Sequence, residues 1–208
     1  MVCLAQVTRN DAAAVIETAN ELLRLSEEHG LPLTRAIALV YLGWALGQAG
    51  DNALGVQRME EGLAAYYRLG ARNNLTFAIC LSAETYLMDK QYEKSMEQVS
   101  AALTASSEIG DRWCVPQINM IRGRILQQTG FSGDAAEASL RMAIDAAQSQ
   151  GAKGSELRAA TSLARLWRDQ GKTVDARELL APVYGWFTEG FDTRDLKEAK
   201  ALLEEMAA

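Results

Sequence analysis

The 208-residue sequence is poor in histidine, cysteine and proline, with one, three and three residues respectively. The single histidine, His29, has no second histidine with which to share a metal or a proton, so we interpret it as a cation at the end of a helix. The cysteines are far apart and form no CxxC pair, so we expect reduced thiols packed between helices. No HExxH, GxSxG or phosphate-binding loop motif occurs. The sequence therefore predicts no catalytic residue, no metal ligand and no cofactor.

Basic charge and long apolar runs are lacking as well. The net charge is −6 and the sequence pI is near 5.0, which excludes the global basic field of a nucleic-acid-binding protein. No apolar run approaches the ~18–20 residues of a membrane-spanning helix. The first residues, MVCLAQVTRN, do not have the basic region, apolar core and cleavage site of a secretory signal. We therefore expect a cytoplasmic protein that binds neither nucleic acid nor membrane.

What the sequence does contain is a repeat. Alanine and leucine dominate, and apolar residues make up 49% of the chain, which favours helices around a substantial core. The sequence matches itself at an offset of 40 and then 41 residues, as marked by Gly30, Gly70, Gly110 and Gly151. A fixed period of ~20–50 residues is typical of solenoids. The sequence thus predicts an all-α fold: an α-α superhelix of about four long helical pairs with flanking helices.

Small residues recur at three further positions of each repeat. Two helices approach to ~8 Å only where small side chains face each other, so these positions predict the contacts within each pair. In the first pair, we expect Gly43 of one helix to meet both Gly55 and Gly62 of the other. The three recurring sets are Gly43, Ala83, Gly123 and Ala164; Gly55, Ser95, Ala136 and Ala176; and Gly62, Ala102, Ala143 and Val183.

No linker or low-complexity segment divides the chain, so we predict a single domain over residues 1–208. The domain is expected to contain a half repeat at 1–30, pairs at 31–70, 71–110, 111–151 and 152–190, and a cap helix at 193–206. In the cap helix, charged residues alternate with Leu196, Ala199, Leu202 and Met206. The helix therefore has one apolar side and one solvent-exposed polar side, as the end of a solenoid needs.

The helical pairs, with small residues at these positions and Gly-Asp or Gly-Lys at the turn, resemble the tetratricopeptide repeat. That repeat is usually 34 residues long, whereas the repeats here have 40 or 41, so the resemblance implies a tetratricopeptide-like solenoid with longer helices.

Residues 151–206 carry a more specific resemblance. The stretches ELRAATSLARLW and LLAPVYGWFTEGFDTRDLKEAKALL look like the C-terminal end of large bacterial proteins that combine an adenylate/guanylate cyclase domain, an AAA-type (signal-transducing) ATPase domain and a repeat region. The resemblance covers the repeat region only. It implies a regulatory role in signal transduction, without catalysis by this chain, since any cyclase or ATPase activity would lie in upstream domains that the chain does not contain.

In tetratricopeptide-like arrays the first helix of each pair lines the concave side, and the resemblance therefore selects a candidate binding face. By register, this face runs from apolar and aromatic near Trp44 to basic near Arg165. Arginine can hold a carboxylate through two parallel hydrogen bonds. We therefore predict that the face binds a protein or peptide segment with an apolar part and an acidic part. The candidate residues are Trp44, Gln48, Phe77, Glu84, Gln117, Arg124, Arg158, Arg165 and Arg168.

Several alternatives stay open from the sequence. In the structural alternative, the arginines pair with acids inside the array and bind nothing; the pairs would join Arg124, Arg158 and Arg165 to Glu84, Glu156 or Asp169. The same groove could hold a small-molecule effector, and an enzyme of unrecognised type is the remote alternative. A C-terminal aromatic cluster either docks the cap helix or serves as an interface for an upstream domain or for a homodimer. It consists of Val183, Tyr184, Trp186 and Phe187 beside Phe191.

Overall fold

The computed structural model describes residues 2–130 and 133–207, so residues 1, 131–132 and 208 of the predicted domain lie outside the described part. Within the described part the chain forms eleven α-helices and no β-strand, which confirms the all-α prediction. The helices are α1 (Val2–Thr8), α2 (Ala12–Glu28), α3 (Pro32–Gln48), α4 (Asn52–Arg68), α5 (Leu75–Met88), α6 (Tyr92–Ile109), α7 (Val115–Gln128), α8 (Gly133–Ser149), α9 (Lys153–Asp169), α10 (Thr173–Gly185) and α11 (Arg194–Glu205).

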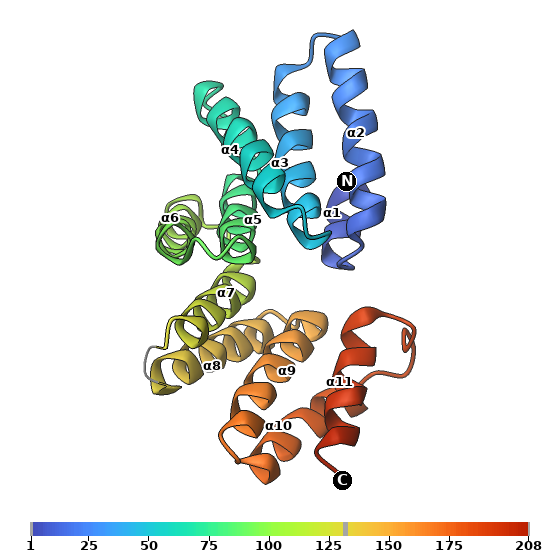
Figure 1. Ribbon diagram of the computed structural model, residues 1–208, viewed down its shortest axis with the longest axis vertical. Coiled ribbons are helices and arrows are strands. Elements are labelled where there is room, and N and C mark those ends of the chain that lie inside the picture. The colour runs from blue at the N-terminus through green and yellow to red at the C-terminus, as the bar shows by residue number, and fades with distance from the viewer. Residues whose placement is uncertain (1, 131–132, 208) are drawn as a thin grey trace. The chain divides into compact units, whose positions relative to one another are not determined.

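The helices belong to two compact units, Met1–Asp111 and Arg112–Ala208. In the first unit α3 pairs with α4 and α5 with α6, while α1 and α2 precede them (Figure 1). In the second unit α7 pairs with α8 and α9 with α10, and α11 packs beside α9 (Figure 1). The helix bounds follow the predicted 40- and 41-residue register closely, whereas the assignment of all 208 residues to one domain stays a prediction.

A left-handed backbone residue follows the first helix of each complete pair. Gly50 has φ +95°, and Lys90, which occupies the equivalent position one repeat later, has φ +59°. Asn10, at the same position of the preceding half repeat, has φ +57°. Side chains other than glycine seldom adopt this region, and asparagine tolerates it better than most. The sharp reversal between paired helices therefore recurs even where the sequence has no glycine to signal it.

Close backbone approach holds the first pair together. A Cβ atom on Gly43 would lie 2.7 Å from the carbonyl oxygen of Gly55 and 2.7 Å from the backbone nitrogen of Met59, so this predicted contact is confirmed. The predicted contact between Gly43 and Gly62 is wrong. Gly62 instead lies against Ala36 and Val40, because antiparallel helices bring the later part of α4 to the earlier part of α3.

The same close contact recurs in the second pair with different chemistry. Ser95 of α6 takes the register of Gly55, and its hydroxyl donates a 2.6 Å hydrogen bond to the carbonyl oxygen of Ala83, which takes the register of Gly43. Both side chains are buried. A hydroxyl group buried at a close helix crossing needs such an acceptor, because an unsatisfied buried polar group costs about 1–3 kcal/mol.

The cap helix α11 has the predicted two-sided character. Leu196, Ala199, Leu202 and Met206 are all buried in the core of the second unit. In the aromatic cluster, Val183, Tyr184 and Phe187 pack against this core, as docking of α11 requires. Trp186 and Phe191 are exposed at 58% and 47%, and the interface role stays a prediction. The three cysteines are buried thiols, as expected.

Replacing Gly43 by alanine should destabilise the protein by about 1–3 kcal/mol, because the new methyl group meets backbone atoms that cannot rotate away. Urea unfolding monitored by circular dichroism measures this change. The matched control is Gly154→Ala in α9, where a Cβ atom meets nothing within 4 Å. The control should be more stable than wild type by about 0.4–1 kcal/mol. Equal effects at the two positions would contradict the close-contact explanation.

Candidate functional site

In the first unit, the predicted face contributes Trp44 and Gln48 from α3 and Phe77 and Glu84 from α5. Trp44, Phe77 and Glu84 are buried, and Gln48 is half-buried. The indole nitrogen Nε1 of Trp44 donates a 3.1 Å hydrogen bond to Oε2 of Glu84. These two residues occupy the same position in successive repeats, so the bond links neighbouring first helices. Among these four side chains, Gln48 has the largest part of its surface open to solvent.

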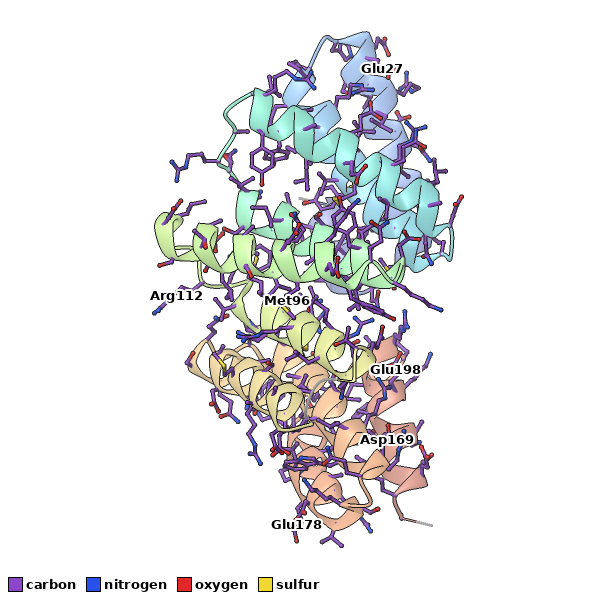
Figure 2. All side chains as sticks on the ribbon, turned by 60° about the vertical axis from the view of Figure 1, so that its left-hand side comes forward. Glu27, Met96, Arg112, Asp169, Glu178 and Glu198 are labelled. Atoms are coloured by element: carbon purple, nitrogen blue, oxygen red, sulfur yellow. The ribbon has the colours of Figure 1, made fainter. Side chains whose placement is uncertain are left out.

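In the second unit, the predicted face contributes Gln117 and Arg124 from α7 and three arginines from α9, all half-buried. We call Arg158, Arg165 and Arg168 the α9 arginine face. Each of these three arginines meets a carboxylate of α11. The contacts are Arg158 Nε to Asp195 Oδ2 at 3.6 Å, Arg165 Nη2 to Glu198 Oε2 at 2.8 Å, and Arg168 Nη1 to Glu205 Oε2 at 2.8 Å. Figure 2 shows Glu198 on α11 and Asp169 at the end of α9.

The partners of Arg158 and Arg165 differ from those that the structural alternative predicted, because both arginines meet acids of α11. Glu156 does not pair with an arginine of this face: it accepts hydrogen bonds from Lys153 Nζ at 2.7 Å and from Gln148 Nε2 at 2.9 Å. Asp169 is paired with its neighbour Arg168, at 2.7 Å, instead of with Arg158 or Arg165.

Sequence reasoning missed the acidic side of α11 as part of this site. Asp195, Glu198 and Glu205 are spaced by three and seven residues, and the α9 arginines by seven and three. Residues at such spacings lie near one face of a helix. The helical spacing of these acids is a signal in the sequence that could have identified an acidic face on α11, although the order of the steps differs between the two helices and does not give the pairing.

Two carboxylates of α11 have pKa values that move in opposite directions. Burial raises the pKa of Asp195, an effect that Arg158 only partly offsets. The Nε atom of Arg158 is itself buried and makes no hydrogen bond with a described residue. Burial also raises the pKa of Glu198, but hydrogen bonds from Arg165 and Arg194 outweigh it, so the net pKa is lowered. The contact is therefore well formed at Glu198 and incomplete at Asp195.

An open hollow of about 460 Å³ lies between α8, α9 and α10 of the second unit. At its side, Trp167 Nε1 donates a 2.9 Å hydrogen bond to Glu137 Oε2, and the guanidinium of Arg141 lies 5.0 Å from the Trp167 ring centre. Burial raises the pKa of Glu137, but its partners lower it more. The carboxylate of Glu137 and the guanidinium of Arg141 therefore already have partners within the protein at this hollow. The lining residues are Glu137, Arg141, Trp167, Lys172, Asp175, Glu178 and Leu179.

Residues 2–130 and 133–207 contain neither a cluster of metal-binding side chains nor a helix suited to span a membrane. No group of three or more His, Cys, Asp or Glu side chains there could hold a metal ion. None of the helices in this range has the length and apolar character needed to cross a membrane.

Comparison with known proteins identifies the fold. No protein-family model matches the chain. An uncharacterised protein of Rhizobium meliloti (strain 1021) is 27% identical over 158 residues, which make up 76% of this chain and 15% of that protein. The chain thus spans about 15% of the length of this relative.

Solved structures match the chain over most of its length. The crystal structure of BtubC (BKLC) from P. vanneervenii superposes with a TM-score of 0.67 and 17% identity, and covers 96% of this chain and 89% of that one. A kinesin light chain-like protein of Podosopora anserina with nearly identical TPR-like repeats superposes with a TM-score of 0.63, also at 17% identity, over 84% of this chain and 86% of that one. The chain therefore has a tetratricopeptide-like solenoid fold, as the sequence predicts.

Replacing Trp44 by phenylalanine should lower the free energy of unfolding by about 1–3 kcal/mol, because the buried carboxylate of Glu84 loses the indole N–H donor. Chemical denaturation measures the loss. The same replacement at the exposed Trp186 is the control and should change stability by no more than about 0.5 kcal/mol. A Trp44 variant as stable as the control would show that the bond contributes nothing.

Replacing Glu198 by glutamine should lower stability at pH 7 by about 0.5–1 kcal/mol, since both partners of the Arg165 pair are more than a third exposed. A lowered pKa in the folded state means that Glu198 contributes stability above its ordinary value of 4.5 and loses it as the pH falls through the lowered pKa. Thermal unfolding of wild type and variant from pH 7 to pH 3 should therefore show converging midpoints.

Asp195→Asn provides the contrast to Glu198→Gln. The raised pKa of Asp195 means that the folded state favours the protonated form, so the stability of this variant relative to wild type should increase as the pH rises above the ordinary value of 3.8. If the two variants followed the same pH trend, the opposite environments assigned to the two carboxylates would be wrong.

Proposed function

We propose that this chain is a non-catalytic protein–protein interaction module that binds a protein or peptide segment with an acidic part. The tetratricopeptide-like fold supports the proposal, because stacked helical repeats create extended binding surfaces. The observation that carries it is the contact between the α9 arginine face and three carboxylates of α11. An acidic amphipathic helix is already seated on this surface, so its chemistry and shape accept such a ligand.

The same surface explains why the protein can bind acidic segments despite its own charge of −6. Three arginines lie along one helix, where the acids of α11 balance their charge, and guanidinium groups form strong hydrogen bonds with carboxylates. Gln117 and Arg124 of α7 belong to the same second unit and extend the set of polar first-helix residues in our proposal.

We further propose that the module is the regulatory repeat region of a bacterial signalling protein of the cyclase and AAA-type ATPase class, in the cytoplasm. The resemblance of residues 151–206 to such proteins supports this assignment. So does the match to a limited part, 15%, of a much longer Rhizobium protein. In this setting the partner is an acidic protein segment, an upstream domain of the same polypeptide, or a second copy that contacts the exposed Trp186 and Phe191.

A second candidate function is the sensing of a small-molecule effector, and the hollow beside Trp167 is the observation that favours it. Its aromatic wall and mixed charges suit a small polar ligand better than an apolar one. Binding there would have to displace Arg141 from the Trp167 ring or use the carboxylates of Asp175 and Glu178 at the edge.

The combined replacement Arg124→Ala and Arg165→Ala should weaken binding of an acidic protein partner about tenfold or more, with little loss of helicity. The immobilised protein is used to enrich partners from cells of the organism that encodes it, and each purified partner is then titrated by calorimetry. The control is Arg24→Ala with Arg177→Ala, which removes the same charge from exposed positions.

The outcome decides between the two functions. A partner that binds wild type and the control equally but loses affinity for the Arg124 and Arg165 variant supports the interaction module. A variant that merely melts earlier while partner binding is unchanged contradicts the assigned surface. If no protein binds, and a metabolite raises the melting temperature of wild type but not of a variant at Trp167, the protein is an effector sensor instead.

A further inference from the structure

The cap helix α11 does more at the α9 arginine face than close the solenoid. A cap needs one apolar side, and Leu196, Leu202 and Met206 supply it. Three carboxylates aligned with three arginines go beyond that need, because half-exposed ion pairs contribute little to stability. Charge complementarity of this kind serves to select and orient a binding partner.

The pairing also defines a ligand pattern. The contacts join residues 158 with 195, 165 with 198, and 168 with 205, so the two helices run parallel and their residue numbers rise together. Counted from Asp195 as position i, the helix presents acids at i, i+3 and i+10 and apolar residues at i+1, i+7 and i+11. Any amphipathic helix with this pattern can make the same set of contacts.

One of the three contacts is incomplete. Arg158 Nε and Asp195 Oδ2 are 3.6 Å apart, and the buried Nε atom makes no hydrogen bond with a described residue. The other two arginine contacts are full hydrogen bonds of 2.8 Å. A glutamate in place of Asp195 extends one methylene further and can close this gap, so α11 is not the tightest acidic helix that this surface can hold.

We propose that α11 is a tethered occupant of the α9 arginine face, and that an acidic amphipathic helix of a partner protein binds there in exchange for α11. The inference rests on the proposed interaction function and names its ligand class and its regulation. The partner helix replaces the apolar and ionic contacts of α11, so the exchange keeps α9 covered, whereas the released α11 exposes its own apolar side. Tethering places α11 at an effective concentration of order mM, which holds the surface closed to weak ligands.

The segment that connects α10 to α11 is suited to such an exchange. Residues 186–193 form no helix, and Trp186 and Phe191 within them are exposed. Gly190, with φ +77°, turns the chain toward α11. Phe187 packs against the core, so the part of the connection that can move with α11 begins after it, and this movement gives up the contact between the rings of Phe191 and Tyr184.

The experiment uses a fluorescent synthetic peptide of residues 193–207 as probe and the full chain with a protease site inserted between Thr188 and Glu189. The protein folds with α11 in place and is then cut, which removes the tether. Fluorescence anisotropy should show the peptide binding the cut protein at least about tenfold more tightly than the uncut protein. A peptide with Asp195→Glu should bind more tightly still, by about threefold or more.

Two controls test the ionic contacts. A peptide with Asp195→Asn, Glu198→Gln and Glu205→Gln keeps its apolar side and should lose about tenfold or more in affinity. In the uncut full chain, Glu198→Arg opposes Arg165 and should open the surface to the probe, whereas the charge swap Arg165→Glu with Glu198→Arg restores an ion pair and should close it again.

The proposal is overturned if the cut protein does not bind the peptide, or if it binds the charge-neutral peptide equally well. It is also overturned if the uncut and cut proteins bind alike, since the tether then controls nothing. These results are independent of the enrichment of natural partners. If the peptide exchanges with α11 but no cellular partner binds, the proposed function alone is refuted. If a cellular partner binds equally well to the cut and the uncut protein, this inference alone is refuted.

Discussion

The close crossing of two antiparallel helices at small residues is the constraint on which the structure depends. Gly43 and Gly55 bring the backbones of α3 and α4 so near that a methyl group on either would strike backbone atoms. Ala83 and Ser95 solve the same problem in α5 and α6 with a hydroxyl bonded to a carbonyl. In these two pairs the small residues set how closely the helices pack, and the helical pairs repeat every 40 or 41 residues.

Within each unit, neighbouring first helices are linked by a donor that meets a carboxylate. In the first unit the donor is the indole of Trp44 on α3 and the acceptor is Glu84 on α5. In the second unit the donor is the guanidinium of Arg165 on α9 and the acceptor is Glu198 on α11. α11 packs beside α9 as α5 packs beside α3, so α11 takes the place of the next first helix. The cap is thus the continuation of the array and not an appendage to it.

The contacts with α11 change the interpretation of the α9 arginine face. An arginine-rich helix in an acidic chain suggests an open basic surface, but every arginine of the α9 arginine face already contacts an acid of the same chain. The charges of this surface are therefore already balanced by α11. Its incomplete contact at Asp195, where burial raises the carboxyl pKa, shows that the fit of α11 is adequate and not optimal.

The sequence by itself determined the all-α class, the repeat length and the crossing of Gly43 with Gly55. It could do so because helix periodicity, glycine at turns and small residues at crossings are local signals that recur in every copy. Only the tertiary structure decided that Gly62 meets Ala36 and Val40, and that the α9 arginines meet the acids of α11. Those choices depend on which faces turn toward each other in space, and a residue's register within its own repeat does not specify its neighbour in the next.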